Sequence, residues 1–196
     1  KVCQEQGLSI SAVMLQRELT EGEQDPEETD RKMDRVLEIM KSAASTPIHT
    51  PVKSMGGLIG GEAKKISDHK DTGKGLCGDL LERAVIYAMA TLETNASMGV
   101  IVASPTAGSA GIVPGLLLAL QETYDLSDEQ IKQGLYNASA IGYLAMRNAT
   151  VAGAVGGCQA EVGIASAMAA SATVELMGGS PEQSLAAAST VLMNML

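Results

Sequence analysis

Cys158 is the residue whose setting most strongly suggests chemistry. It follows a glycine-rich stretch, "GAVGG" at 153–157, and precedes a run with strong helical character. A thiol at the start of a helix lies near free backbone N–H groups and the positive end of the helix dipole. Both stabilise a thiolate, the form that attacks as a nucleophile or binds metal. The alternative is a small buried apolar side chain, the common fate of an isolated cysteine.

A second candidate site is the segment "SPTAGSAG", residues 104–111. Small residues and hydroxyls precede an expected helix here, so that successive backbone N–H groups can converge on an anion such as a carboxylate. No lysine follows the glycines, which excludes a Walker motif. The predicted ligand-contacting residues are Ser104, Thr106, Ala107, Gly108 and Ser109. The alternative is a tight helix–helix crossing that requires Gly108 and Gly111.

The other residues with chemical potential stand in less suggestive settings. His49 and His69 are expected to be exposed loop residues, and Cys3 and Cys77 to be structural. Three widely spaced cysteines suit a reducing cytoplasm better than a secreted disulfide framework. The start of the chain lacks the basic and then apolar layout of a signal peptide, so no export is expected.

Composition limits the class of partner. The formal net charge of −9 argues against binding to nucleic acid, which requires clustered Lys and Arg. Residues 1–83 hold 12 of the 14 basic residues, so we expect this part to form a solvated cover and residues 84–196 to form the core. The stretch 98–120 carries no charge and is long enough to span a bilayer. Its glycines and prolines favour a buried core segment instead, and no membrane span is predicted.

The elements that must position these residues are predicted to be helices, packed closely through Ala, Gly and Met, because the chain has no Trp or Phe and eleven Met. No alternating pattern of useful length is present, and 99–104 is the best strand candidate. The fold class is therefore all-α, as one domain over residues 1–196 with glycine-rich loops at the active site. Helices are expected over 1–20, 26–44, 80–93 and 110–124, from Ser127, over 158–177 and from Pro181. The last helix has no ending signal, so we expect the chain to be cut short inside a larger domain.

Four stretches together resemble the α chain of the bacterial iron-sulfur-dependent L-serine dehydratases. They are "GLIGGEAKKI" (57–66), "NASMGVIVASPTAGSAGIVPG" (95–115), "GAVGGCQAEVGIASAMAA" (153–170) and "ELMGGSPEQSL" (175–185). The resemblance implies a lyase that converts L-serine to pyruvate and ammonia. It implies a 4Fe-4S cluster held by three cysteines, whose open iron binds the substrate hydroxyl as a Lewis acid while a protein base removes the α-proton.

The resemblance also assigns residues and partners. Cys158 matches the first cluster cysteine, and Lys65 matches a lysine that could offset substrate or cluster charge. The carboxylate role of the segment 104–111 is a physical inference from its backbone N–H groups and hydroxyls, and only its place beside the cluster comes from the resemblance. The base is expected in the β portion of the family, so a separate β chain and a homo- or hetero-oligomer are implied.

The sequence also departs from the family pattern. The other two cluster cysteines would follow the last residue, so this chain alone is not expected to assemble the cluster. Ile59 and Glu62 stand where Thr and Asp are expected. Two alternatives stay open, a desulfidase of the same architecture that acts on L-cysteine, and a non-catalytic helical module that binds a small acid or a partner chain.

Overall fold

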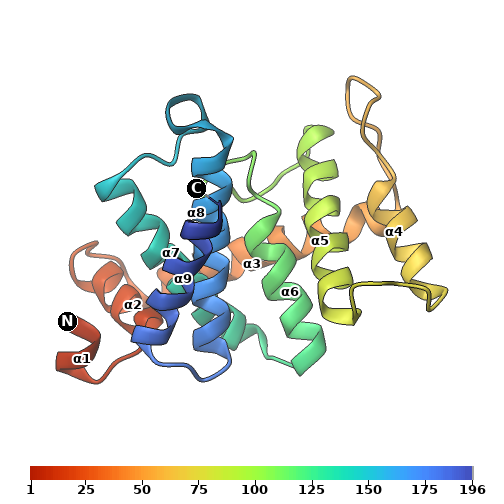
Figure 1. The fold of residues 1–196 in the computed structure, drawn as a ribbon. Helices are drawn as coiled ribbons and strands as arrows, with labels where there is room; N and C mark the ends of the chain where they lie inside the picture. Colours follow the sequence, from red (N-terminus) through yellow and green to blue (C-terminus); the bar gives the residue numbers. More distant parts are fainter. Residues whose placement is uncertain (196) are drawn as a thin grey trace. The chain divides into compact units, whose positions relative to one another are not determined.

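The computed structural model describes residues 1–195, and over that range it consists of helices joined by loops, without strands (Figure 1). The prediction of an all-α fold is confirmed. The helices are α1 (Val2–Gln6), α2 (Ile10–Thr20), α3 (Pro26–His49), α4 (Glu62–Asp71), α5 (Asp79–Ala96), α6 (Ile112–Tyr124), α7 (Asp128–Asn148), α8 (Gly153–Leu176) and α9 (Pro181–Met195). None of the described helices is both long enough and apolar enough to cross a membrane.

The chain divides into two compact units, residues 1–37 with the residues from 127 onward, and residues 38–126. In the first unit, α8 packs against both α7 and α9, and α2 packs against α7 (Figure 1). In the second unit, α5 packs against α4 and α6. The assignment of residues 1–196 to a single domain stays a prediction.

Local capping signals place several helix ends as expected. The Ser127 side chain accepts a hydrogen bond from the Gln130 backbone N–H, and the Gln130 side chain accepts one from the Ser127 N–H, so α7 begins with a capping box. Ser180 and Gln183 make the same pair of bonds before α9, which begins at Pro181 as predicted.

The prediction of one helix over 1–20 is wrong. Gly7 adopts a left-handed conformation with φ 65° and ends α1. Ser9 then caps α2 by accepting a hydrogen bond from the Ala12 N–H at 3.2 Å. The stretch 99–104 forms neither strand nor helix, and helix α6 starts at Ile112, two residues later than expected.

Helix α3 runs five residues past its predicted end at Ala44, through Pro47. A proline inside a helix leaves the carbonyl four residues earlier without its usual N–H donor. That carbonyl belongs to Ala43, and the Thr94 hydroxyl on α5 donates to it at 2.9 Å. The side chain from another helix therefore compensates for the missing backbone bond.

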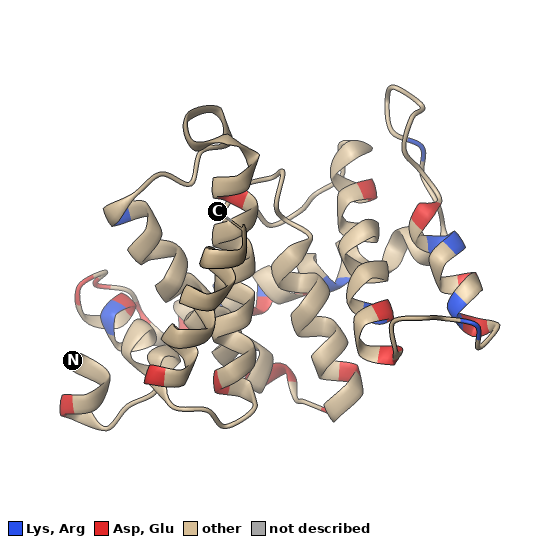
Figure 2. Cartoon of the chain, in the orientation of Figure 1, with Lys and Arg blue, Asp and Glu red and all other residues tan. Residues whose placement is uncertain are grey.

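Core residues come from both parts of the sequence, which corrects the expectation that residues 1–83 form only a cover. Ile10, Met14, Leu37, Met40 and Ala63 are all buried. The helices that carry them are amphipathic, so the charged residues line one face and the apolar residues pack on the other. Lysines do gather on α4 and the adjoining loops, while α8 and α9 carry few charges (Figure 2).

Two polar clusters, each around one buried side chain, join helices of the first unit. Glu175, near the end of α8, accepts hydrogen bonds from the Ile10 N–H at 2.9 Å and from the Asn137 side chain at 2.7 Å. Glu175 thereby caps the N-terminus of α2, although the two are far apart in the sequence. The Lys132 side chain, 8% exposed, contacts the carboxylates of Asp30, Asp34 and Glu129. Its hydrogen bond to Asp30 raises the pKa of the Lys132 ammonium group.

Two fully buried serines in this unit offer a matched test of packing. Ser171 donates to the Asn137 side-chain oxygen at 2.6 Å, whereas the Ser184 hydroxyl has no partner among the described residues. Ser184→Ala is expected to leave the free energy of unfolding unchanged or to raise it by about 1 kcal/mol, because an unsatisfied buried hydroxyl is removed. Ser171→Ala is expected to lower it by about 1–3 kcal/mol. Urea unfolding followed by circular dichroism measures the free energy of unfolding of both variants. Equal destabilisation by the two substitutions would contradict the assignment of Ser184 as unpartnered and Ser171 as hydrogen-bonded.

Candidate functional site

The predicted anion-binding segment lies in the loop that joins α5 to α6, within the unit 38–126. The loop leaves α5 through a tight turn in which the Gly99 N–H donates to the Thr94 carbonyl at 2.8 Å. It ends at Gly111, the N-cap of α6. The segment 104–111 therefore precedes a helix N-terminus, as predicted from the sequence.

The hydroxyls of this loop are close together and partly buried. The Thr106 and Ser109 hydroxyls lie 3.0 Å apart, and the Ser109 hydroxyl is also 3.4 Å from the Ser104 carbonyl oxygen. Ser104 and Ser109 are buried, whereas Ala107 and Gly108 are exposed. The Ser104 hydroxyl has no hydrogen-bond partner among the described residues. A buried hydroxyl without a partner is uncommon in proteins and calls for an explanation.

Packing also explains part of the glycine pattern. A Cβ atom added at Gly111 would lie 2.6 Å from the Ala88 carbonyl oxygen of α5, and one added at Gly115 would lie 2.9 Å from that of Ala84. Both distances are too short for a carbon–oxygen contact, so α5 and α6 approach through glycine. The close-crossing interpretation therefore holds for Gly111, while exposed Gly108 remains a candidate for ligand contact.

The last turn of α5 holds three separate segments of this unit. The buried Glu93 carboxylate accepts hydrogen bonds from the Gly61 N–H at 3.0 Å and the Ala63 N–H at 2.7 Å, at the start of α4. Thr94 bonds to α3, as described above. The Asn95 side-chain amide donates to the Ala107 carbonyl at 3.0 Å, inside the candidate loop. Three consecutive residues thus fix α4, α3 and the loop.

Lys65 lies in the first turn of α4 and is exposed. Within the described residues, no hydrogen bond or ion pair joins its side chain to the loop. Glu62, which replaces the expected Asp, accepts a hydrogen bond from the Gly60 N–H at 2.6 Å. That bond lowers the pKa of the Glu62 carboxyl. The predicted exposure of His49 and His69 is confirmed, but both lie in helices, at the end of α3 and in α4.

Cys158 lies in the other unit and is exposed. Gly157 has φ 77° and ψ 167°, which interrupts α8 and makes Cys158 the first residue of its long segment. The helix start predicted there is confirmed, with an additional turn from Gly153 before it. Among the described residues Cys158 is therefore not a buried packing residue.

The described residues do not provide a complete metal site. No group of three or more His, Cys, Asp or Glu side chains is placed to hold a metal ion in residues 1–195. Cys3 and Cys77 are free thiols, as is Cys158. These residues therefore do not fit a cluster held by three cysteines of this chain alone, and Cys158 can supply at most one ligand.

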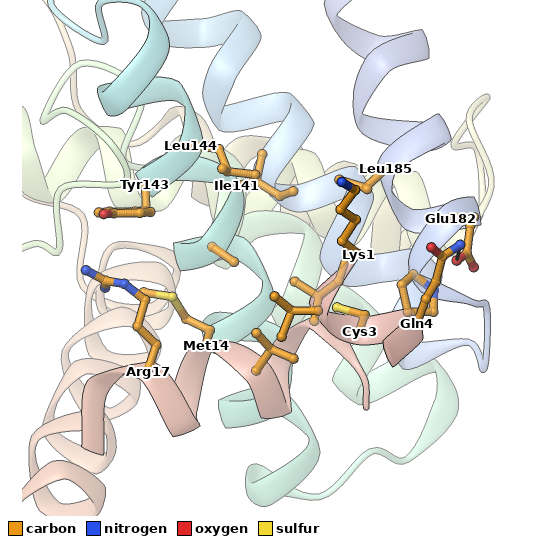
Figure 3. Close-up of a pocket in the computed structure, with 15 residues that line it drawn as sticks. Lys1, Cys3, Gln4, Met14, Arg17, Ile141, Tyr143, Leu144, Glu182 and Leu185 are labelled. Atoms are coloured by element: carbon orange, nitrogen blue, oxygen red, sulfur yellow. Dashed lines mark hydrogen bonds between the residues drawn. The ribbon is translucent and has the colours of Figure 1, made fainter. Parts of the chain in front are cut away.

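A groove of about 560 Å³ lies among α1, α2, α7 and α9 (Figure 3). Its lining is mainly apolar, with the Arg17 guanidinium stacked 4.1 Å from the centre of the Tyr143 ring at one end. Cys3 lines it, but the residues predicted for the site are not among the described residues that do. The groove is thus distinct from the site that the sequence predicts.

Two residues at the site were missed from sequence. Glu93 carries a signal that could have revealed it, because it follows Ile86 and Ala90 at helical spacing and so falls on the buried face of α5. A carboxylate on such a face requires buried donors. Asn95 carries no comparable signal, because its partner is a backbone carbonyl.

Comparison with known proteins gives a consistent result. Residues 5–196 match the family described as serine dehydratase alpha chain. The chain is 45% identical over 196 residues to the probable L-serine dehydratase, alpha chain, of Bacillus subtilis (strain 168), and this covers all of the chain and 65% of that protein. It is 42% identical over 195 residues to the L-serine dehydratase, alpha chain, of Peptoniphilus asaccharolyticus, covering all of the chain and 67% of that protein. With L-serine dehydratase 2 of Escherichia coli (strain K12) the identity is 33% over 195 residues, covering 93% of the chain and 41% of that protein.

Proposed function

Since this chain belongs to the serine dehydratase alpha chain family, we propose that it forms the α part of a cytoplasmic enzyme that converts L-serine to pyruvate and ammonia. The observation that carries the proposal is the match over residues 5–196, together with 45% identity to a relative of that name. The chain spans 65% of that relative's length. We therefore propose the activity for the whole protein, with the β chain that the name of this relative implies as its partner.

The role of the loop at 104–111 is to hold the substrate carboxylate. Backbone N–H groups before a helix, with the positive end of its dipole behind them, favour an anion. The Ser104, Thr106 and Ser109 hydroxyls add donors to the same place. The unpartnered, buried Ser104 hydroxyl supports this role, because a bound carboxylate oxygen would satisfy it. Exposed Ala107 and Gly108 allow the ligand to reach the backbone.

Cys158 is proposed as one thiolate ligand of the 4Fe-4S cluster that the family resemblance implies. In the complete enzyme the cluster would supply a Lewis-acidic iron near the substrate hydroxyl. Because the described residues supply at most one of its ligands, the steps assigned to this chain are limited to binding and orientation. Lys65 is proposed to offset negative charge of the substrate.

The overall reaction is a loss of water followed by hydrolysis. The Cα–H bond and the Cβ–O bond of serine break, giving aminoacrylate and water. The imine tautomer of aminoacrylate then takes up water and releases pyruvate and ammonia. The base that removes the α-proton is proposed to lie in the β chain.

The test is pyruvate release from L-serine by the complete α chain with its β partner, purified without oxygen. Pyruvate from L-serine, with little from D-serine or L-cysteine, is the expected result. Faster release of sulfide and pyruvate from L-cysteine would replace the proposal with a desulfidase. No turnover of either amino acid, from a protein with intact iron, would reject it in favour of a binding module.

A further inference from the structure

We infer that Asn95 is a positioning residue, which fixes the direction of the Gly108 N–H in the carboxylate-binding loop. The inference rests on the proposed function and extends it to a residue outside the predicted substrate contacts. Its basis is the hydrogen bond from the Asn95 side-chain amide to the Ala107 carbonyl oxygen, at 3.0 Å.

Peptide geometry turns this bond into an orientation. The carbonyl of Ala107 and the N–H of Gly108 belong to one planar peptide unit, and in a trans peptide the two groups point in opposite directions. The Ala107 carbonyl accepts hydrogen bonds from the Asn95 side chain at 3.0 Å and, more weakly, from the Ala110 N–H at 3.4 Å. The shorter bond directs the carbonyl toward α5, so the Gly108 N–H is directed away from α5. Ala107 and Gly108 are exposed, so the peptide unit that carries this N–H lies at the surface of the loop.

Asn95 is itself held firmly. It lies in the last turn of α5, and its carbonyl accepts a hydrogen bond from the Met98 N–H at 3.1 Å. The two residues before it are fixed by long-range contacts, Glu93 to the start of α4 and Thr94 to α3. Because the last turn of α5 is fixed, a donor on it can set the orientation of a peptide in the loop. The short side chains of the loop itself move together with the loop and cannot do so.

Asn95→Asp is the informative substitution, because it keeps the size of the side chain and replaces the N–H donor with a carboxylate oxygen. That oxygen repels the Ala107 carbonyl, so the peptide rotates and the Gly108 N–H is lost to the substrate. In the complete enzyme we expect the KM for L-serine to rise about 10- to 100-fold, the range of one hydrogen bond to a charged group. The kcat is expected to stay within a factor of about three, since carboxylate binding is shared by ground and transition states.

Thr94→Val is the matched control. It removes a hydrogen bond of similar length from the neighbouring residue of the same helix, and it leaves the Ala43 carbonyl without a donor. We expect a lower melting temperature and an unchanged KM. A KM for Asn95→Asp equal to that of the wild type, or an equal rise in Thr94→Val, would overturn the inference.

Hydrogen–deuterium exchange separates this inference from the proposed function. Asn95→Asp is expected to speed exchange in the peptide that covers residues 104–111, and Thr94→Val is not. If the wild-type enzyme fails to act on L-serine, the proposed function is rejected, and the exchange result still decides the role of Asn95. Unchanged exchange in Asn95→Asp would reject that role.

Discussion

Replacing Glu93 with alanine is expected to lower the free energy of unfolding by about 3–5 kcal/mol. The Glu93 side chain is 1% exposed, and its two oxygens accept the Gly61 and Ala63 N–H groups at the start of α4. Alanine leaves the buried Ala63 N–H and the partly buried Gly61 N–H without this acceptor and creates a cavity between α4 and α5. It also removes the negative charge that stabilises the N-terminus of α4.

The measurement is urea unfolding of the complete protein followed by circular dichroism. Glu93→Gln keeps the shape of the side chain and one acceptor oxygen. We therefore expect it to lower the free energy of unfolding by about half as much as Glu93→Ala. Glu27→Ala is the control, because Glu27 is an exposed carboxylate in the first turn of α3 and contributes no more than about 1 kcal/mol there. Equal unfolding midpoints for Glu93→Ala and Glu27→Ala would show that the buried carboxylate does not cap α4.

Cys158→Ser in the complete enzyme is expected to reduce pyruvate release from L-serine by more than about 100-fold. Loss of a metal ligand exceeds the 10- to 100-fold cost of losing its outer-shell support. The stability of the polypeptide should change by less than about 0.5 kcal/mol, because Cys158 is exposed and outside the core. Iron content per protein is the second readout, and it should fall together with activity.

Cys77→Ser is the matched control, since Cys77 is also an exposed free thiol. It is expected to retain both activity and iron. Normal iron content and activity in Cys158→Ser would reject the assignment of Cys158 as a cluster ligand. Equal losses in both variants would indicate general damage by thiol replacement.

The sequence by itself determined the features that depend on neighbours within one helical turn. The pairs Ser127/Gln130 and Ser180/Gln183 fixed the starts of α7 and α9, because each cap bonds three residues along the chain. Gly157 before Cys158 marked the start of the long segment of α8, because a positive φ favours glycine. The family resemblance came from such local stretches as well.

Only the tertiary structure decided the features that join distant residues. Pro47 ends no helix, because Thr94, 51 residues from Ala43, donates to the carbonyl that the proline leaves free. Glu93 binds Gly61 across 32 residues, and Asn95 binds Ala107 across 12. Each of these three bonds has a backbone amide or carbonyl as one partner. Nearly every residue type provides such groups, so the sequence carries no pattern that names the partner. The place of the loop before α6 was therefore predictable from sequence, and the side-chain contacts that hold it were not.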